Sequence, residues 1–410
     1  MLGWFPAAGE LAWPLVVALA WAAGEVVARW QVPRIGAYAV IGFVFSPSVL
    51  GVLPAQGGPG ALLANIAFGL MLFEFGYRIN LHWFRINPWL TATGLLESLL
   101  SAVAVYALAH VLGASTLTAL LLASLAMVTS PAALVRAVNE LRSSGQVTER
   151  ALHLAALDCV LAVFAFKTIV GFWTFDSSGD IVKALSDSAV VLVVSAALGG
   201  SFGALVPAVL ARFGRYGNDR TLAFAISVVV LVAVAQALRY SPLIATLAFG
   251  LVARHRRVTL DQAQRNFGVL GELLAVVLFV HVAAAVDWPR VVSGLALGLG
   301  LVLARGIAKV LGTSLLARPS GTTWRKGALT GLAMMPMSVF VVLLIEDSRQ
   351  LGVDLMDTLA PLAAATLVLD LLGPLITQLA LRAAGETQRI EGTPDRQKKE
   401  RHGAGTVQDL

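Results

Sequence analysis

The sequence has a single cysteine, Cys159, among its 410 residues. One thiol excludes an intrachain disulfide and any zinc site built from several cysteines. Charged residues are also scarce, because they make up 13% of the chain, whereas a soluble domain carries roughly a quarter. No Lys or Arg precedes the first apolar run, so we expect no secretory signal peptide.

Motifs of several other protein classes are missing as well. The sequence contains no HExxH zinc motif, and we expect no enzyme activity. We likewise expect no cofactor and no resident metal ion. No segment resembles the carbonyl filter loop of a pore-type channel, which disfavours that class of membrane protein.

Apolar residues, in contrast, are abundant. They make up 58% of the chain, and the mean hydropathy is +0.80. Runs of roughly 20 apolar residues, the length that crosses a bilayer, recur along the whole sequence. The sequence therefore predicts an all-α polytopic membrane protein in a lipid bilayer. We expect about thirteen spans: 11–29, 35–53, 61–77, 89–112, 116–136, 151–174, 188–211, 221–238, 241–253, 268–286, 291–316, 327–345 and 356–381.

The net charge of +6 reflects membrane topology and not a nucleic-acid partner. With the N-terminus outside, the inner loops and the tail hold most of the basic residues. The outer loops carry few: Lys183, Arg239, Arg290 and Arg349. This asymmetry follows the positive-inside rule and predicts a cytoplasmic C-terminus. We expect the protein to lie in the cell inner membrane. We expect a transmembrane domain over 1–384 and a disordered cytosolic tail over 385–410.

Two prolines suggest internal symmetry. An outside start lets 11–174 and 221–381 form two inverted halves, an arrangement that many secondary transporters share. Pro131 lies in "LASLAMVTSPAALVRA", the fifth span of the first half, and Pro336 lies in "GALTGLAMMPMSVFVVLL", the fifth of the second. Proline removes a backbone donor and clashes with the preceding turn, so each helix should kink or unwind there. A simple kink without function is the alternative.

Asp158, in "AALDCVLAVF", is the most informative polar residue within a span. A central Asp costs roughly 2.5–3.5 kcal/mol, so it should face the bundle interior with a cationic partner. Arg305 and Lys309 are candidates, because they lie four residues apart on one face of "GLVLARGIAKVLGTSLLA". Lys167, further along the helix of Asp158, is a third. The ion pair between Asp158 and Lys309 is either part of a titrating site or purely structural.

Other polar groups within spans are weaker candidates. Thr129 and Ser130 precede Pro131 and offer oxygen atoms to a small cation, although such hydroxyls often bond to their own helix. Glu97, in "GLLESLLSAV", is either a second proton-binding group or a satisfied structural carboxylate. We expect structural roles for the remaining groups: Glu25, Glu74, Glu272, Asp370 and His281.

Several segments, taken in order, resemble a known family. These are "RIGAYAVIGFVFSPSVLG", "LMLFEFGYRINL", "MVTSPAALVRAVNELRSSGQVTERALHLAALDCVLAVF", "SPLIATLAFGLVA", "ARGIAKVLG" and "LVLDLLGPL". Together they are similar to the monovalent cation:proton antiporters of the sodium/proton exchanger superfamily. The resemblance implies a dimerisation bundle, an ion-translocating core with crossed discontinuous helices, and usually a homodimer. It also implies an elevator-type exchange of sodium or potassium for protons.

The resemblance also assigns roles to individual residues. The family carries adjacent acidic positions, Asp-Asp or Asn-Asp, in one helix, and a gapless alignment puts Asp158 first and Cys159 second. Lys309 matches the family's lysine that pairs with the first acid. The implied ion- and proton-binding positions are therefore Asp158, Thr129, Ser130 and Cys159. A one-residue slip would instead make Asp158 the second acid.

Cys159 is the main departure from the family pattern. Sulfur is a poor ligand for hard cations such as sodium, which prefer oxygen. With one acid in place of two, we expect any exchange to be nearer electroneutral than in double-acid relatives. The alternative is a non-exchanging or altered-substrate homologue, a sensor or regulatory membrane protein, in which Asp158 and Lys309 form a structural ion pair.

Overall fold

A computed structural model describes residues 8–30, 32–53, 59–174, 180–213, 219–256, 267–337, 339–342, 344–345 and 359–387. These residues form α-helices joined by short turns, and none of them lies in a β-strand. The helices are α1 (Ala8–Ala28), α2 (Arg34–Val44), α3 (Pro59–Arg78), α4 (Leu81–Ile86), α5 (Pro88–Val111), α6 (Thr116–Ala126), α7 (Pro131–Leu141), α8 (Gln146–Thr174), α9 (Ile181–Phe213), α10 (Asp219–Ala237), α11 (Pro242–His255), α13 (Gly268–Ala284), α14 (Trp288–Ser293), α15 (Leu295–Leu315), α16 (Trp324–Ala333) and α18 (Ala360–Ala383).

The prediction of an all-helical, multi-pass membrane protein is confirmed. Seven helical segments are long and apolar enough to cross a bilayer, and they are Leu11–Ala28, Pro88–Val111, Thr116–Leu141, Gln146–Trp173, Ile181–Arg212, Leu295–Leu315 and Pro361–Ala383. Shorter apolar helices follow at Arg34–Val44, Thr221–Ala237, Pro242–His255 and Gly268–Ala284. Every predicted span contains helical residues, although the total of thirteen spans and the inverted repeats stay predictions.

Some predicted boundaries are wrong. The helix predicted over 35–53 ends at Val44, because Pro47 lacks a backbone donor and disfavours helical geometry at Ser46. A compact turn follows, in which the Gly51 amide donates to the Ser46 carbonyl at 2.8 Å. The segment 291–316 divides at Gly294 into α14 and α15. Of the predicted tail 385–410, only 385–387 lie within the described residues.

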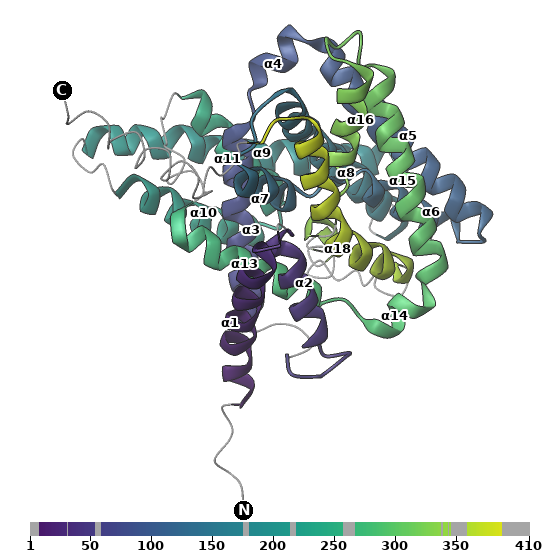
Figure 1. The fold of residues 1–410 in the computed structure, drawn as a ribbon. Helices are drawn as coiled ribbons and strands as arrows, with labels where there is room; N and C mark the ends of the chain where they lie inside the picture. The colour runs from purple at the N-terminus through teal and green to yellow at the C-terminus, as the bar shows by residue number, and fades with distance from the viewer. Residues whose placement is uncertain are drawn as a thin grey trace, which may run out of the picture.

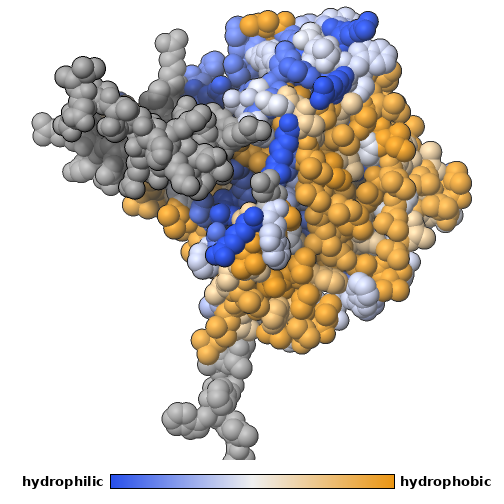
Figure 2. Space-filling model, in the orientation of Figure 1, coloured by the Kyte–Doolittle hydropathy of each residue, from blue (hydrophilic) through white to orange (hydrophobic). Residues whose placement is uncertain are grey.

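The outer surface suits a bilayer. Large apolar side chains such as Leu303 and Val193 stand more than half exposed on the long helices. In Figure 2 apolar residues cover a broad band of the surface, and hydrophilic residues gather towards its upper rim. The N-terminal end of α1 and α14 lie at the lower side of Figure 1, and α4 lies at the upper side. Such a band in water would drive aggregation, whereas lipid solvates it.

The helices pack in two groups. In one, α3 packs against α10, α11 and α13, while α11 also packs against α9. In the other, α15 packs against α5, α16 and α18, and α8 packs against α5, α6 and α16. The groups meet mainly at three pairs of helices. With the helix of the first group named first, these pairs are α3 with α7, α2 with α18, and α9 with α8. The second group contains Asp158, Lys309 and both prolines of interest, so it positions the candidate site.

Candidate functional site

Both proline segments are interrupted helices. Helix α6 ends at Ala126, Met127 caps it with helical backbone angles, residues 128–130 leave the helical conformation, and α7 begins at Pro131. Likewise α16 ends at Ala333, residues 334–337 are non-helical, and helix resumes at Val339. The Ser130 amide donates to the Pro336 carbonyl at 2.7 Å. The two unwound segments therefore lie side by side and bond to each other inside the second helix group.

Arg305 on α15 satisfies the carbonyl groups that this unwinding releases. Its guanidinium donates to the carbonyls of Ala126 at 2.9 Å, Val128 at 2.6 Å, Met335 at 2.8 Å and Met334 at 3.2 Å. The sequence predicted Arg305 as an ion-pair partner of Asp158, yet among the described residues it forms no salt bridge of its own. The physical reason is that buried carbonyls without donors are costly, and a planar fork of five N–H groups can reach several of them.

Asp158 lies on α8 beside the unwound segment that contains Thr129 and is completely buried. Its Oδ2 atom accepts from Lys309 Nζ at 2.8 Å and from Thr129 Oγ1 at 2.6 Å. Its Oδ1 atom accepts from Ser98 Oγ of α5 at 2.8 Å. A buried carboxylate with one cationic partner and two hydroxyl donors is stable as an anion, because its charge and its lone pairs are compensated.

Lys309 joins Asp158 to a second acid, Glu97. Its ammonium lies 2.9 Å from Glu97 Oε2 and 3.2 Å from Oε1, and it also donates to the Met127 carbonyl at 3.2 Å. The side chains of Lys309, Glu97 and Asp158 are all fully buried. Three acceptor groups surround the nitrogen, which matches the three hydrogens of a charged ammonium.

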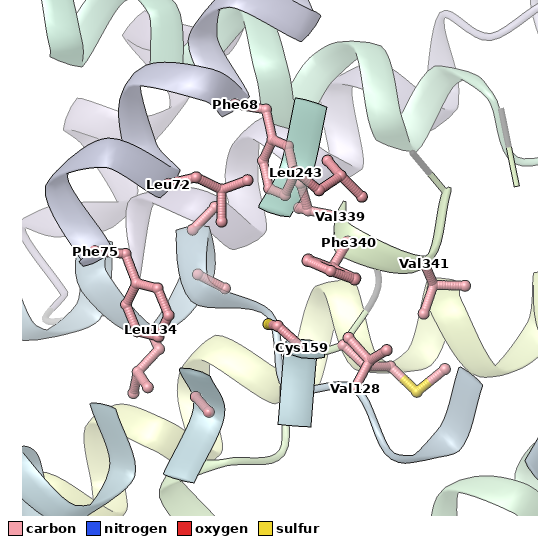
Figure 3. Close-up of a cluster of buried hydrophobic side chains, with 14 of the residues drawn as sticks. Phe68, Leu72, Phe75, Val128, Leu134, Cys159, Leu243, Val339, Phe340 and Val341 are labelled. Carbon is pink, nitrogen blue, oxygen red and sulfur yellow. The ribbon is translucent and has the colours of Figure 1, made fainter. Parts of the chain in front are cut away.

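Cys159 faces a different environment from its neighbour. Its sulfur donates weakly to the Thr129 carbonyl at 3.6 Å and is fully buried. Figure 3 shows the side chain among apolar groups that include Phe75 of α3, Leu134 of α7 and Phe340. Position 159 therefore points towards apolar side chains at the contact between the two helix groups.

The structure brings together some predicted site residues and separates others. Thr129, Asp158 and Lys309 form one bonded cluster. The Ser130 hydroxyl instead accepts from the Ala133 amide at 3.5 Å, capping α7, so its described contacts serve the helix start. Lys167 is only half-buried and lies roughly 13 Å further along α8, from the helical rise per residue.

Two participants were missed or undervalued in the sequence. Ser98 was not singled out, and the only signal for it is a hydroxyl beside Glu97 in an apolar run. Glu97 was predicted to be either structural or proton-binding, and its contact with Lys309 was not foreseen. The other acids lie elsewhere: Glu25 pairs with Arg34 at 3.0 Å, Glu74 with Arg78 at 2.9 Å, and Glu272 approaches Arg136 at 3.9 Å.

Chemically, this cluster suits reversible binding of a proton or a small hard cation. Asp158 offers carboxylate oxygens, Ser98 and Thr129 offer hydroxyl oxygens, and Met127 offers a carbonyl within the same bonded network. Oxygen donors are the ligands that hard monovalent cations prefer. No group of three or more His, Cys, Asp or Glu residues able to hold a metal ion occurs in the described ranges.

Comparisons with known proteins agree with this architecture. The sequence pattern of the family described as "Sodium/hydrogen exchanger, transmembrane" matches residues 15–383. No curated protein matches the chain significantly. Two solved structures of the sodium proton antiporter MjNhaP1 from Methanocaldococcus jannaschii share the fold at 16% identity.

The first, at pH 8, has a TM-score of 0.62 and covers 91% of this chain and 95% of that one. The second, from an electron-microscopy map, has a TM-score of 0.66 and covers 91% and 97%. At this identity the likeness shows the fold alone. The family pattern, in contrast, spans most of the sequence and includes both interrupted helices and the Asp158 helix. The chain therefore belongs to the sodium/hydrogen exchanger family of transmembrane proteins.

Proposed function

We propose that the protein is a secondary active transporter that exchanges a monovalent cation, sodium or potassium, for protons at Asp158. The observation that carries this proposal is the buried Asp158 carboxylate beside two unwound, hydrogen-bonded helix segments, with Lys309 Nζ 2.8 Å away. Broken helices near the membrane centre are a recurring location of ion sites in transporters. Intramembrane carboxylates are also functional by default, because they are costly to bury.

In this proposal Lys309 and the cation compete for Asp158. The cation takes the place of the ammonium at Oδ2, while the hydroxyls of Thr129 and Ser98 turn their oxygen lone pairs towards it. A proton arriving at Asp158 removes its negative charge, which expels the cation and weakens the contact with Lys309. Each ligand thus binds only when the other has left, and this mutual exclusion is the coupling that antiport requires.

Alternating access is proposed to follow an elevator-type motion of the second helix group against the first. The apolar side chains around Cys159, including Phe75 of α3 and Leu134 of α7, support this proposal. Such contacts are non-directional and can be remade after a shift, unlike a hydrogen-bonded ladder. We further propose a homodimer in the cell inner membrane with the N-terminus outside and the C-terminus cytoplasmic, from the family pattern and the charge asymmetry.

A second candidate function rests on Cys159 and on the complete pairing of Asp158. Here the protein is a non-exchanging homologue with a sensing or regulatory role, and the Asp158–Lys309 contact is a structural ion pair. Cys159→Asp separates the two candidates. If this variant gains cation-driven proton flux that the natural protein lacks, the natural chain is not an ordinary antiporter.

The test of exchange uses purified protein in liposomes that hold a pH-sensitive dye. We expect sodium, potassium or lithium added outside to dissipate an imposed pH gradient with the natural protein. Asp158→Asn should abolish this response, because a neutral amide cannot bind either ligand by charge.

Asp287→Asn is the matched control, since Asp287 is partly exposed and pairs only loosely with Arg290 at 3.7 Å. Thermal stability of both variants establishes that they are folded. Flux in Asp158→Asn equal to that of the natural protein would refute the proposal.

A further inference from the structure

Glu97 is a buried acid that the exchange step does not itself use. Its side chain is fully buried and bonds to Lys309 through both oxygen atoms. A buried carboxylate is expensive unless it compensates a nearby positive charge. Its only cationic partner among the salt bridges of the described residues is Lys309, which is also the partner of Asp158. Lys309 therefore has two carboxylate partners, Asp158 and Glu97, although one would balance its charge.

Backbone packing ties Glu97 to Lys309. A Cβ atom added at Gly312, three residues after Lys309, would lie 2.5 Å from both Cα and Cβ of Glu97. The backbones of α5 and α15 therefore approach each other closely at this level, and these helices pack extensively. Asp158 is on a third helix, α8. Lys309 can consequently lose its contact with Asp158 while Glu97 remains beside it.

This arrangement matters at the moment when a cation displaces Lys309 from Asp158. Without Glu97, the ammonium would be left in a buried site with only the Met127 carbonyl, and a desolvated lysine readily releases its proton. With Glu97 ionised, the ammonium keeps a carboxylate at 2.9 Å. This carboxylate stabilises the charged form of Lys309 throughout the transport cycle.

We propose that Glu97 is a positioning residue that retains the proton of Lys309 during cation binding, so that one proton is exchanged for each monovalent cation. This inference rests on the proposed exchange at Asp158. In this proposal Glu97 stays negative and Lys309 stays positive in both states, so the proton-loaded and the cation-loaded cluster carry the same charge. Moving them in opposite directions transfers no net charge across the membrane.

Replacing Glu97 by Gln should change the stoichiometry and not only the rate. The displaced Lys309 ammonium of Glu97→Gln passes one proton to water, in addition to the proton that leaves Asp158, so two protons move per cation. Glu97→Asp is the matched control, because it keeps the negative charge and should keep the exchange electroneutral. A role of Glu97 in stability alone would alter both variants without changing charge movement.

The experiment measures exchange in liposomes with sodium, or with potassium if the flux assay selects it. A gradient of the permeant anion thiocyanate sets the membrane potential without a competing cation. We expect the equilibrium cation gradient of the natural protein and of Glu97→Asp to be independent of potential. For Glu97→Gln, a membrane potential of 100 mV should change the equilibrium ratio of inside to outside cation concentration by about 50-fold. Proton release on cation binding in detergent should likewise rise from about one per site to about two.

Each outcome decides the inference. It is overturned if the natural protein already responds to potential or releases two protons per cation, or if Glu97→Gln exchanges cations with no response to potential. Where Glu97→Gln does not fold, the proton count of the natural protein decides alone. A natural protein without any cation-driven flux refutes the proposed exchange itself, and the role of Glu97 falls with it.

Discussion

At the scale of single residues, Cys159 and Asp158 show how two neighbours on one helix can face different surroundings. Asp158 points into a network of donors, whereas Cys159 points into apolar side chains at the contact between the two helix groups. A thiol behaves there as a small hydrophobe with a weak donor. The Cys159 sulfur is therefore compatible with its buried apolar surroundings. It is not among the donors that compensate the charge of Asp158.

Substitutions at position 159 test this assignment. Cys159→Ala removes one buried sulfur and should lower the free energy of unfolding by about 1 kcal/mol while preserving cation-driven flux. Cys159→Asp places a charge among apolar groups and should cost roughly 2.5–3.5 kcal/mol. Thermal unfolding in detergent measures both, with the flux assay alongside. Loss of flux in Cys159→Ala at normal stability would show that the sulfur is a ligand.

At the scale of helices, the two interruptions depend on a third element. Unwinding at 128–130 and 334–337 exposes carbonyl groups in the protein interior, where water does not replace the lost donors. Arg305 of α15 supplies them from a single guanidinium. One turn later Lys309 bonds to the Met127 carbonyl and to both acids. Helix α15 thus stabilises the two unwound segments with Arg305 and contributes Lys309 to the candidate site.

Arg305→Lys is the corresponding test. An ammonium preserves the charge but lacks the planar fork, so several of the four carbonyl partners lose their donor. We expect a loss of roughly 1–3 kcal/mol for each unsatisfied carbonyl, seen as a lower unfolding temperature. Arg290→Lys, on a partly exposed side chain, is the control and should change little. Equal stability of the two variants would contradict the bridging role.

At the scale of the whole molecule, the described arrangement is closed around the site. Asp158, Cys159 and Lys309 have no exposed surface, and apolar side chains of both helix groups lie over Cys159. Polar contacts between the groups lie elsewhere, for example where Asn139 Nδ2 of α7 donates to Glu74 Oε1 of α3 at 2.9 Å. The exchange proposed at Asp158 therefore needs the two groups to separate or slide before ions can reach it.

Cys159 is a natural reporter of that movement, because it is the only cysteine in the sequence. A maleimide should label it about 10- to 1,000-fold more slowly than in detergent-unfolded protein, since open states are usually minor. Sodium or potassium should change this rate in the natural protein and leave it unchanged in Asp158→Asn. A rate that does not respond to either cation in the natural protein would argue against ion-coupled opening at this contact.

The helical class, the membrane environment, the interruption near each proline and the burial of Asp158 and Lys309 were all within reach of the sequence. These inferences depend on local properties: apolar run length, the missing N–H of proline, and the cost of a charge in an apolar helix. The helix end at Val44 and the division at Gly294 were not foreseen, because turn geometry overrides an otherwise continuous apolar run.

Only the tertiary structure decided which groups share the site. Glu97 and Ser98 lie about 60 residues from Asp158 along the chain, and Lys309 lies further still, so their contacts depend on how α5, α8 and α15 pack. The same packing turned Arg305 towards backbone carbonyls and Lys309, one turn later, towards two acids. Sequence spacing puts both cations on one helix face, but the partner of each depends on which helix, and which unwound segment, lies opposite it.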